Sequence, residues 1–337
     1  MKKYKKRRNL FEIPIPVPFP HTVYKTCRPN SVPPEKVWDD LVNFLAREYL
    51  DPSSFRWVFR GVSKESYRLK SKLERELESS KNWREQLEKE LKSSGKKITR
   101  GWTEKLKRVN RQEAEIYLLS QFKRAAHHFV EPSIVPTNDL EWLALMQHYG
   151  TPTRLLDFTR SPYVACYFAL EEVKESDTNR ECAIWAIDAN WLSRITFRRI
   201  RSIIGKGKFT FRDILGSKFI QEHFNDFYDN DSASAILPIF TPRLNVRLLV
   251  QQGLFLCPSA TKETFEEILS SYKNDTKSME KHVHKIVIEG RLRHEVLAEL
   301  HSMNISRTSL FPGLEGFATS LKHEMYYKSS SELTTLS

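Results

Sequence analysis

The stretch QHYGTPTRLLDFTRSP, at residues 147 to 162, decides the predicted fold around it. Gly150 marks the end of a short helix for which residues 137 to 139 supply capping side chains. Residues 154 to 159 then fit a short strand. Ser161 and Pro162 predict the start of a second helix, because a hydroxyl cap followed by proline suits the first helical turn. The stretch is too polar for a core strand and too regularly punctuated for an irregular loop, so we interpret it as part of a site.

A second short stretch, Phe59-Arg60-Gly61, ends an earlier run of aromatic and β-branched residues. Aromatic and β-branched residues favour strands, so we expect Arg60 at a strand end, where Gly61 lets the chain turn closely. The pattern elsewhere predicts helices at 37 to 45, 112 to 130, 163 to 173 and 291 to 303. It predicts strands at 182 to 188, within 247 to 258, and at 283 to 288.

Helices and strands in this order predict an α+β fold, with a central split antiparallel or mixed sheet, flanking helices and a helical insertion. Seven prolines make residues 1 to 34 an extended basic arm. Residues 35 to 322 form the main domain, in which the charged segment 74 to 111 is the insertion, and residues 323 to 337 form a flexible tail.

Composition fits a globular protein, with 40% hydrophobic and 12% aromatic residues and a net charge of +12. The sequence has no apolar run long enough to span a bilayer and no secretory signal at its start, so we expect no membrane contact and a cytoplasmic location. The four cysteines are far apart and lack metal-ligand spacing, so we expect buried free thiols and no metal.

Several polar side chains around residue 157 suggest a pocket for a negatively charged ligand: Arg60, Arg154, Asp157, Thr159 and Ser161. An ion pair between Asp157 and one of the two arginines would be structural, and it would leave the other arginine unexplained. The hydroxyl of Ser161 can cap a helix or help bind an anion at its N-terminus. His148 can act as an acid or base, or simply hydrogen-bond at a helix end.

Four segments together resemble the FRG domain family: Phe59-Arg60-Gly61, residues 142 to 169, residues 251 to 255, and residues 305 to 321 with their SLFPGLEG motif. The resemblance spans about residues 35 to 322. That family occurs widely in bacteria and in phage-linked loci, so it implies a bacterial phage-defence or toxin setting. The family name does not imply a particular reaction.

The order of these segments is also distantly similar to that of ADP-ribosyltransferases, which carry a strand-end Arg-Gly, a Ser-Thr-Ser strand leading into a helix, and a glutamate-bearing strand. This similarity implies that the central sheet is like that of ADP-ribosyltransferases. It also implies a nucleotide-binding site for NAD, which would be a substrate. Arg60 would hold its phosphate or ribose, and Thr159 and Ser161 would shape the nicotinamide pocket. Gly61, His148, Tyr149 and Arg154 would complete the binding residues.

Gln251 and Gln252 stand where that family has its catalytic glutamate, and here this sequence departs from the pattern. A glutamate stabilises the cationic transition state through its charge, whereas an amide can only hydrogen-bond. Either Asp157 supplies the carboxylate from another position, or the domain binds its nucleotide without turnover. The resemblance therefore implies an ADP-ribosyltransferase or NAD glycohydrolase with candidate catalytic residues Asp157, Gln251 and Gln252, or a binding protein.

Two other functions fit the sequence. Basic residues cluster at 1 to 8, 96 to 111 and 194 to 218, and they could bind nucleic acid through its phosphates or remain a solvated surface. The polar residues around Asp157 could instead form a structural core in a non-catalytic module that binds another protein.

Overall fold

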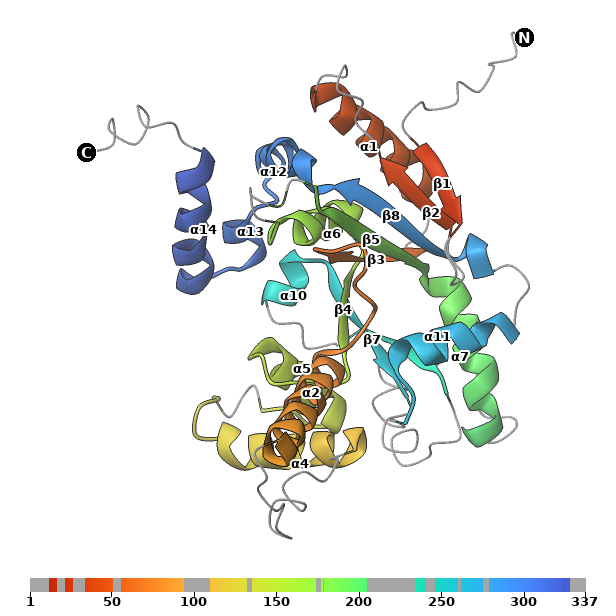
Figure 1. Cartoon of the computed structure of the whole chain (residues 1–337), viewed down its shortest axis with the longest axis vertical. Coiled ribbons are helices and arrows are strands. Elements are labelled where there is room, and N and C mark those ends of the chain that lie inside the picture. The colour runs from red at the N-terminus through yellow and green to blue at the C-terminus, as the bar shows by residue number, and fades with distance from the viewer. Residues whose placement is uncertain are drawn as a thin grey trace.

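The computed structural model describes residues 12–16, 22–26, 34–50, 56–93, 110–131, 135–173, 177, 179–204, 234–240, 246–259, 262–274 and 279–327. The described strands form one sheet in the order β1-β2-β8-β5-β3-β4-β7-β6 (Figure 1). The strands are β1 (Glu12–Pro16), β2 (Thr22–Thr26), β3 (Trp57–Val62), β4 (Leu156–Thr159), β5 (Glu181–Asp188), β6 (Ile236–Ile239), β7 (Gly253–Pro258) and β8 (Val283–Glu289).

Neighbouring strands from β8 to β6 are antiparallel, whereas β2 lies parallel to β8, so the sheet is mixed. The joint between β3 and β4 is short, because only Phe59 and Thr159 are paired there. By contrast, β3 and β5 are paired from Trp57 to Val62. The predicted α+β class and mixed sheet are confirmed, whereas the expected split is not seen, because the described strands form one continuous sheet in which β3 and β4 are paired.

Helices cover both faces of the sheet (Figure 1). They are α1 (Pro34–Tyr49), α2 (Lys72–Ser93), α4 (Arg111–Ala126), α5 (Asp139–His148), α6 (Pro162–Leu170), α7 (Ala189–Ile204), α10 (Val246–Val250), α11 (Phe265–Ser271), α12 (Arg293–Ser302), α13 (Arg307–Leu310) and α14 (Leu314–Tyr327). Short 3₁₀ turns occupy Tyr272–Asn274, Met279–Lys281 and Gly290–Leu292.

Three apolar clusters form the core. One joins α1, α6 and α12 to one face of β3, β5 and β8 through residues such as Leu45, Phe59 and Ala165. The second joins α7 and α11 to the opposite face. The third packs α4 and α5 against β6 and β7, around Leu143 and Phe255. Burial of this apolar area supplies the main driving force for the fold.

The path of the chain through α5, β4 and α6 follows from local signals in the sequence. The side chain of Asn138 caps α5 by accepting a hydrogen bond from the backbone N–H of Glu141. Gly150 follows the helix with a φ of +83°, a left-handed value that glycine adopts without strain. Ser161 caps α6 and Pro162 occupies its first turn, as the sequence predicts.

Gly61 lies inside β3 against the backbone of α6, rather than at a turn. A Cβ atom at this position would be 2.0 Å from the carbonyl oxygen of Ala165 and 2.6 Å from the backbone nitrogen of Ala169. Both atoms belong to the helix backbone, which cannot move aside as a side chain can. The glycine is therefore needed for the close approach of α6 to the strand that carries Arg60.

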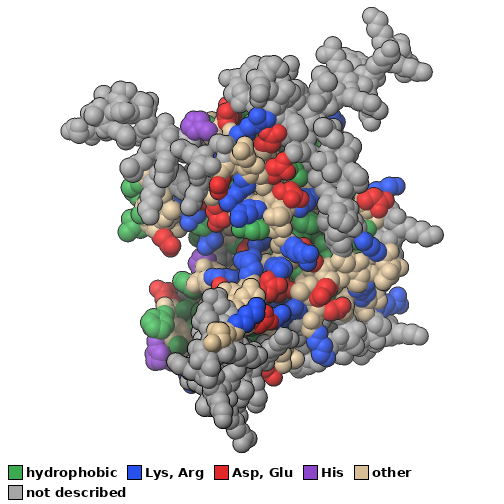
Figure 2. All heavy atoms as spheres, in the orientation of Figure 1, with side chains coloured by type: hydrophobic (Ala, Val, Ile, Leu, Met, Phe, Trp, Pro, Cys, Tyr) green, Lys and Arg blue, Asp and Glu red, His purple; other side chains and the backbone are tan. Residues whose placement is uncertain are grey.

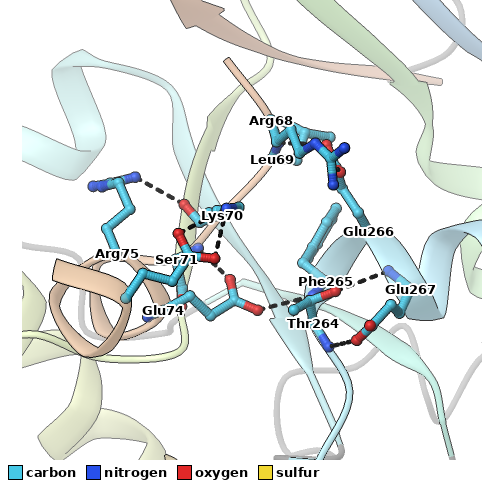
Figure 3. Close-up of polar contacts among 11 residues, drawn as sticks. Arg68, Leu69, Lys70, Ser71, Glu74, Arg75, Thr264, Phe265, Glu266 and Glu267 are labelled. Carbon is cyan, nitrogen blue, oxygen red and sulfur yellow. Dashed lines mark hydrogen bonds and ion pairs between the residues drawn. The ribbon is translucent and has the colours of Figure 1, made fainter. Parts of the chain in front are cut away.

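Two glutamates fasten the start of α2 to the start of α11 (Figure 3). The carboxylate of Glu74 accepts hydrogen bonds from the backbone N–H of Ser71, at 2.6 Å, and of Phe265, at 3.1 Å. In return, Glu266 on α11 accepts from the backbone N–H of Leu69 at 2.9 Å. Because each carboxylate serves a donor of the other segment, the base of the predicted insertion is held against the sheet.

Several sequence-based expectations need correction. The strand predicted within residues 247 to 258 is present as β7, but the helix α10 that precedes it was not predicted. Helix α7 is 16 residues long, whereas residues 190 to 192 after the preceding strand predict only a turn or short helix. The predicted buried face of the 112 to 130 helix holds for Leu119 and Ala126, but Ile116 and Phe129 are 48% and 85% exposed.

The N-terminal arm contributes strands β1 and β2. Of the tail predicted for residues 323 to 337, residues 323 to 327 belong to helix α14, and the rest lies outside the described residues, as does the centre of the insertion. Cys166, Cys182 and Cys257 are buried free thiols, as predicted, and burial raises their pKa values to about 12, 11 and 12. In the described part of the chain, no helix is long and apolar enough to cross a membrane, and no metal-ligand cluster occurs.

Candidate functional site

The guanidinium of Arg60 lies beside the joint between β3 and β4, with 19% of its side chain exposed. Its Nη1 donates a hydrogen bond of 2.6 Å to the backbone carbonyl of Asp157 and is 3.9 Å from the Oδ2 atom of the same residue. Within the described residues this carbonyl is its one hydrogen-bond acceptor, although a guanidinium carries five N–H donors. Arg60 is therefore a mostly buried cation with most of its donors available.

Burial lowers the pKa of Arg60 below its ordinary value; the carboxylate of Asp157 opposes this shift and the cation of Arg75 adds to it. The charged form is thus less favoured here than in water, because desolvation is only partly offset by a neighbouring anion. An added anion would favour the charged form and complete its hydrogen bonding.

Asp157 extends from β4 toward solvent, with 56% of its side chain exposed. Its Oδ2 atom accepts a hydrogen bond of 2.9 Å from Nε2 of Gln147 on α5, and Gln147 in turn accepts from Thr153 at 2.7 Å. The predicted ion pair of Asp157 with Arg60 is present but long. The carboxylate is held in place by α5 and remains accessible.

Arg247 on α10 is a second cation near Asp157, and sequence reasoning missed it. Its guanidinium lies 4.3 Å from the ring centroid of Phe311 and makes no hydrogen bond or ion pair with another described residue. Burial lowers its pKa; Asp157 raises it, and Arg307 lowers it further. The signal in the sequence was a lone charge at the start of an apolar run.

His148 and Tyr149 lie at the end of α5, with ring centroids 4.8 Å apart. Burial, and then the charge of Arg247, lower the pKa of His148, so its imidazole is neutral at pH 7. No hydrogen bond joins this ring to the described residues, so the helix-end hydrogen bond expected for it is not seen there. The ring of Tyr149 is exposed.

Thr159, Ser161 and Gln251 are close together, but their polar groups are engaged. The hydroxyl of Thr159 donates to the carbonyl of Gln251 at 2.7 Å and accepts from the backbone N–H of Ser161 at 3.0 Å. The hydroxyl of Ser161 accepts from the N–H of Val164 at 3.3 Å, which confirms its role as a helix cap. These hydroxyls fix the backbone between β4 and α6.

The two glutamines form the turn between α10 and β7. The amide of Gln251 donates to the carbonyl of Leu310 at 3.0 Å and so ties this turn to α13. Gln252 is exposed and has a φ of +50°, while its carbonyl accepts from the N–H of Arg160 at 3.0 Å. The side chain of Gln251 is thus directed to the backbone of α13, and that of Gln252 is at the surface.

Arg154 is not part of this group. Its side chain is 5% exposed and forms a buried ion pair with Glu115 on α4, in which Nε donates to Oε2 at 2.6 Å. Nη1 donates to the carbonyls of Pro258 and Ser259. The structural partner of Arg154 is therefore Glu115 and not Asp157, and the pair joins α4 to β7 beneath the site.

The predicted basic segments fall largely outside the described residues, except on α7 and at Arg111. Arg194, Arg198 and Arg201 are exposed on α7. Arg199 is engaged internally, because it donates to the carbonyl of Ser234 at 2.6 Å and lies 4.3 Å from the ring of Tyr272. On the described part of α7, three arginines are thus exposed and one is engaged internally.

Lys and Arg side chains gather across the middle of the face shown in Figure 2, and the surface is hollowed beside them at the left edge. In Figure 1 the same level of the molecule holds α10 and β4, between α13 and α14 above and α5 below. Arg60 and Arg247 both offer N–H donors to anions, and the accessible carboxylate of Asp157 acts on both.

Residues 55–178 match the model of the FRG domain. The match includes Phe59-Arg60-Gly61 and the stretch from 147 to 162, whereas the turn at Gln251 and α13 lie beyond it. No curated protein and no solved structure matches this chain.

Proposed function

We propose that this protein binds a phosphate-bearing nucleotide, with NAD as the first candidate, through Arg60. The observation that supports this proposal is the hydrogen bonding of the Arg60 guanidinium, which is mostly buried yet uses one donor on a backbone carbonyl. Its other N–H donors have no partner among the described residues and can therefore take an anionic partner. Guanidinium matches phosphate well because it can donate two parallel hydrogen bonds.

A purely structural role for Arg60 accounts for less of its geometry. One charge-assisted hydrogen bond contributes about 1.5–3 kcal/mol, which is less than the cost of removing a guanidinium from water. The carboxylate of Asp157, at 3.9 Å, is oriented by Gln147 rather than by Arg60. Arg154 is an example of a structural arginine in the same molecule. Both Arg154 and its partner Glu115 are buried, and its Nε donates to the carboxylate at 2.6 Å.

The similarity to ADP-ribosyltransferases leads us to place any turnover on Asp157. Gln251 donates its amide to the carbonyl of Leu310, and an amide has no charge to offer a cationic transition state. Asp157 is an exposed carboxylate next to Arg60. Cleavage of the nicotinamide bond, by hydrolysis or by transfer to an acceptor, would use this negative charge. A role in bacterial phage defence remains part of the proposal.

Titration calorimetry with NAD tests the binding step. We expect saturable heat with the wild type, no measurable heat with Arg60→Ala, and unchanged heat with Arg194→Gln, which removes an exposed arginine from α7. Thermal melting of each variant checks that it is folded. Equal heats for the wild type and Arg60→Ala, or no heat from either, would refute nucleotide binding at Arg60.

Turnover is tested separately by measuring release of nicotinamide from NAD. We expect release by the wild type and its loss in Asp157→Asn, while Asp157→Asn still binds NAD in the calorimeter. Release by Asp157→Asn at the wild-type rate would exclude Asp157 as the catalytic carboxylate. No release by wild type that binds NAD would show a binding protein without turnover.

A further inference from the structure

Two arginines from separate helices share one aromatic ring. Arg247 on α10 lies 4.3 Å from the ring centroid of Phe311, and Arg307 on α13 lies 3.7 Å from the same centroid. Cations are attracted to the face of an aromatic ring, and the attraction grows where water is excluded. The ring of Phe311 therefore holds two like charges close together, which repel one another.

The position of Phe311 is fixed by its surroundings. Its backbone N–H donates to the carbonyl of Arg307 at 2.9 Å, and its ring meets that of Phe168 edge to face at 6.0 Å. A Cβ atom at Gly316 on α14 would be 1.8 Å from the carbonyl oxygen of Phe311, so α14 packs directly on this backbone. Phe311 is thus a rigid platform for the two guanidinium groups.

The two arginines are only partly neutralised. Arg307 donates from Nη1 to Glu171 at 2.6 Å, but its Nε is buried without a hydrogen-bond partner. Arg247 has no ion pair with a described residue, although Asp157, Glu315 and Glu171 act on it at longer range. One close carboxylate therefore serves two cations, and unused N–H donors remain on both.

This second group of cations adjoins the Arg60 site. Asp157 acts electrostatically on both Arg60 and Arg247, and the amide of Gln251 ties the turn after α10 to the carbonyl of Leu310, next to Phe311. We infer that Arg247 and Arg307, held by Phe311, form a second anion subsite, so that the ligand carries two linked phosphoryl groups. The inference rests on the proposed nucleotide binding at Arg60 and narrows its ligand to diphosphates and dinucleotides.

The experiment compares AMP with ADP, which share base and ribose and differ by one phosphoryl group. Affinities are measured by calorimetry for the wild type, Arg60→Gln, Arg247→Gln and Phe311→Leu. Arg194→Gln is the control, since it removes the same charge from an exposed position on α7. Phe311→Leu removes the aromatic platform but keeps an apolar side chain, and melting temperatures show whether each variant is folded.

We expect the wild type to bind ADP at least about tenfold more tightly than AMP, because each charge-assisted hydrogen bond contributes that much or more. Arg247→Gln and Phe311→Leu should remove this preference and leave AMP affinity within about twofold of the wild type. Arg60→Gln should weaken both ligands, and Arg194→Gln neither.

Each other outcome has a distinct meaning. Equal affinity of the wild type for AMP and ADP, or an unchanged preference in Arg247→Gln, would overturn the second subsite while nucleotide binding at Arg60 stands. Equal weakening of both ligands by Arg247→Gln would overturn it as well, since Arg247 would then belong to the first phosphate position. Failure of the wild type to bind AMP, ADP and NAD would remove the proposed function and this inference with it, whereas binding of NAD without ADP would overturn this inference alone.

Discussion

Replacement of Gly61 by alanine tests how closely the Arg60 strand and α6 must pack. The added Cβ would be 2.0 Å from the carbonyl oxygen of Ala165 and 2.6 Å from the nitrogen of Ala169. Relief of these contacts requires β3 and α6 to separate by about 1 Å, because atoms in real structures do not approach so closely. Overpacking of a core costs about 1–3 kcal/mol, and contacts with helix backbone lie at the upper end of that range.

We therefore expect Gly61→Ala to lower the free energy of unfolding by about 3 kcal/mol, measured by urea denaturation at constant m-value. Gly253→Ala is the matched control, since its Cβ would meet mainly Cδ1 of Leu248, the end of a flexible side chain, at 2.4 Å. The control should lose about 1 kcal/mol or less. A loss below about 1 kcal/mol for Gly61→Ala, or equal losses in both variants, would refute this account of the glycine.

Three further results are expected. Glu115→Gln should lower the free energy of unfolding by about 3–5 kcal/mol in urea denaturation, because it leaves the charge of Arg154 buried without its partner; a loss under about 1 kcal/mol would contradict the buried pair. Burial lowers the pKa of His284 to about 4, so the unfolded chain gains a proton near pH 6.5 and the folded one only near pH 4. The stability that this group contributes is present above pH 6.5 and is lost as the pH falls toward 4. In His284→Gln the free energy of unfolding should therefore fall by roughly 2 kcal/mol less over this pH range than in the wild type, whereas His301→Gln, at an exposed position, should behave as the wild type. Asp157→Asn should raise the affinity for inorganic phosphate about two- to fivefold by removing a nearby negative charge; weaker binding would show that Asp157 itself helps to hold the anion.

Local signals made the path from α5 to α6 predictable. The caps at Asn138 and Ser161, the proline at 162 and the glycine at 150 each act within a few residues of their own position. In such cases both partners of the interaction lie within a few residues of one another, so a single sequence shows them together. Within residues 247 to 258 the predicted strand is present as β7, but helix α10 was not predicted, because a short apolar run is compatible with either helix or strand when tertiary packing decides.

The candidate site was only partly predictable for a related reason. Arg60 and Asp157 do meet, but the partners that distinguish one arginine from another come from distant positions. Glu115 engages Arg154, and Phe311 places Arg247, at sequence separations that no local pattern reveals. A single sequence shows which residues are polar, whereas the fold shows whether their donors are already used.

The single paired position between β3 and β4 has a mechanical consequence. Strands β8, β5 and β3 form one hydrogen-bonded block, and β4, β7 and β6 form another. Arg60 bridges this seam, since it extends from β3 and donates to a carbonyl of β4. If a bound anion accepted this hydrogen bond from Arg60, the contact between Arg60 and β4 would be lost. Anion binding should therefore change the rate of amide hydrogen exchange along β4 and not in the helices.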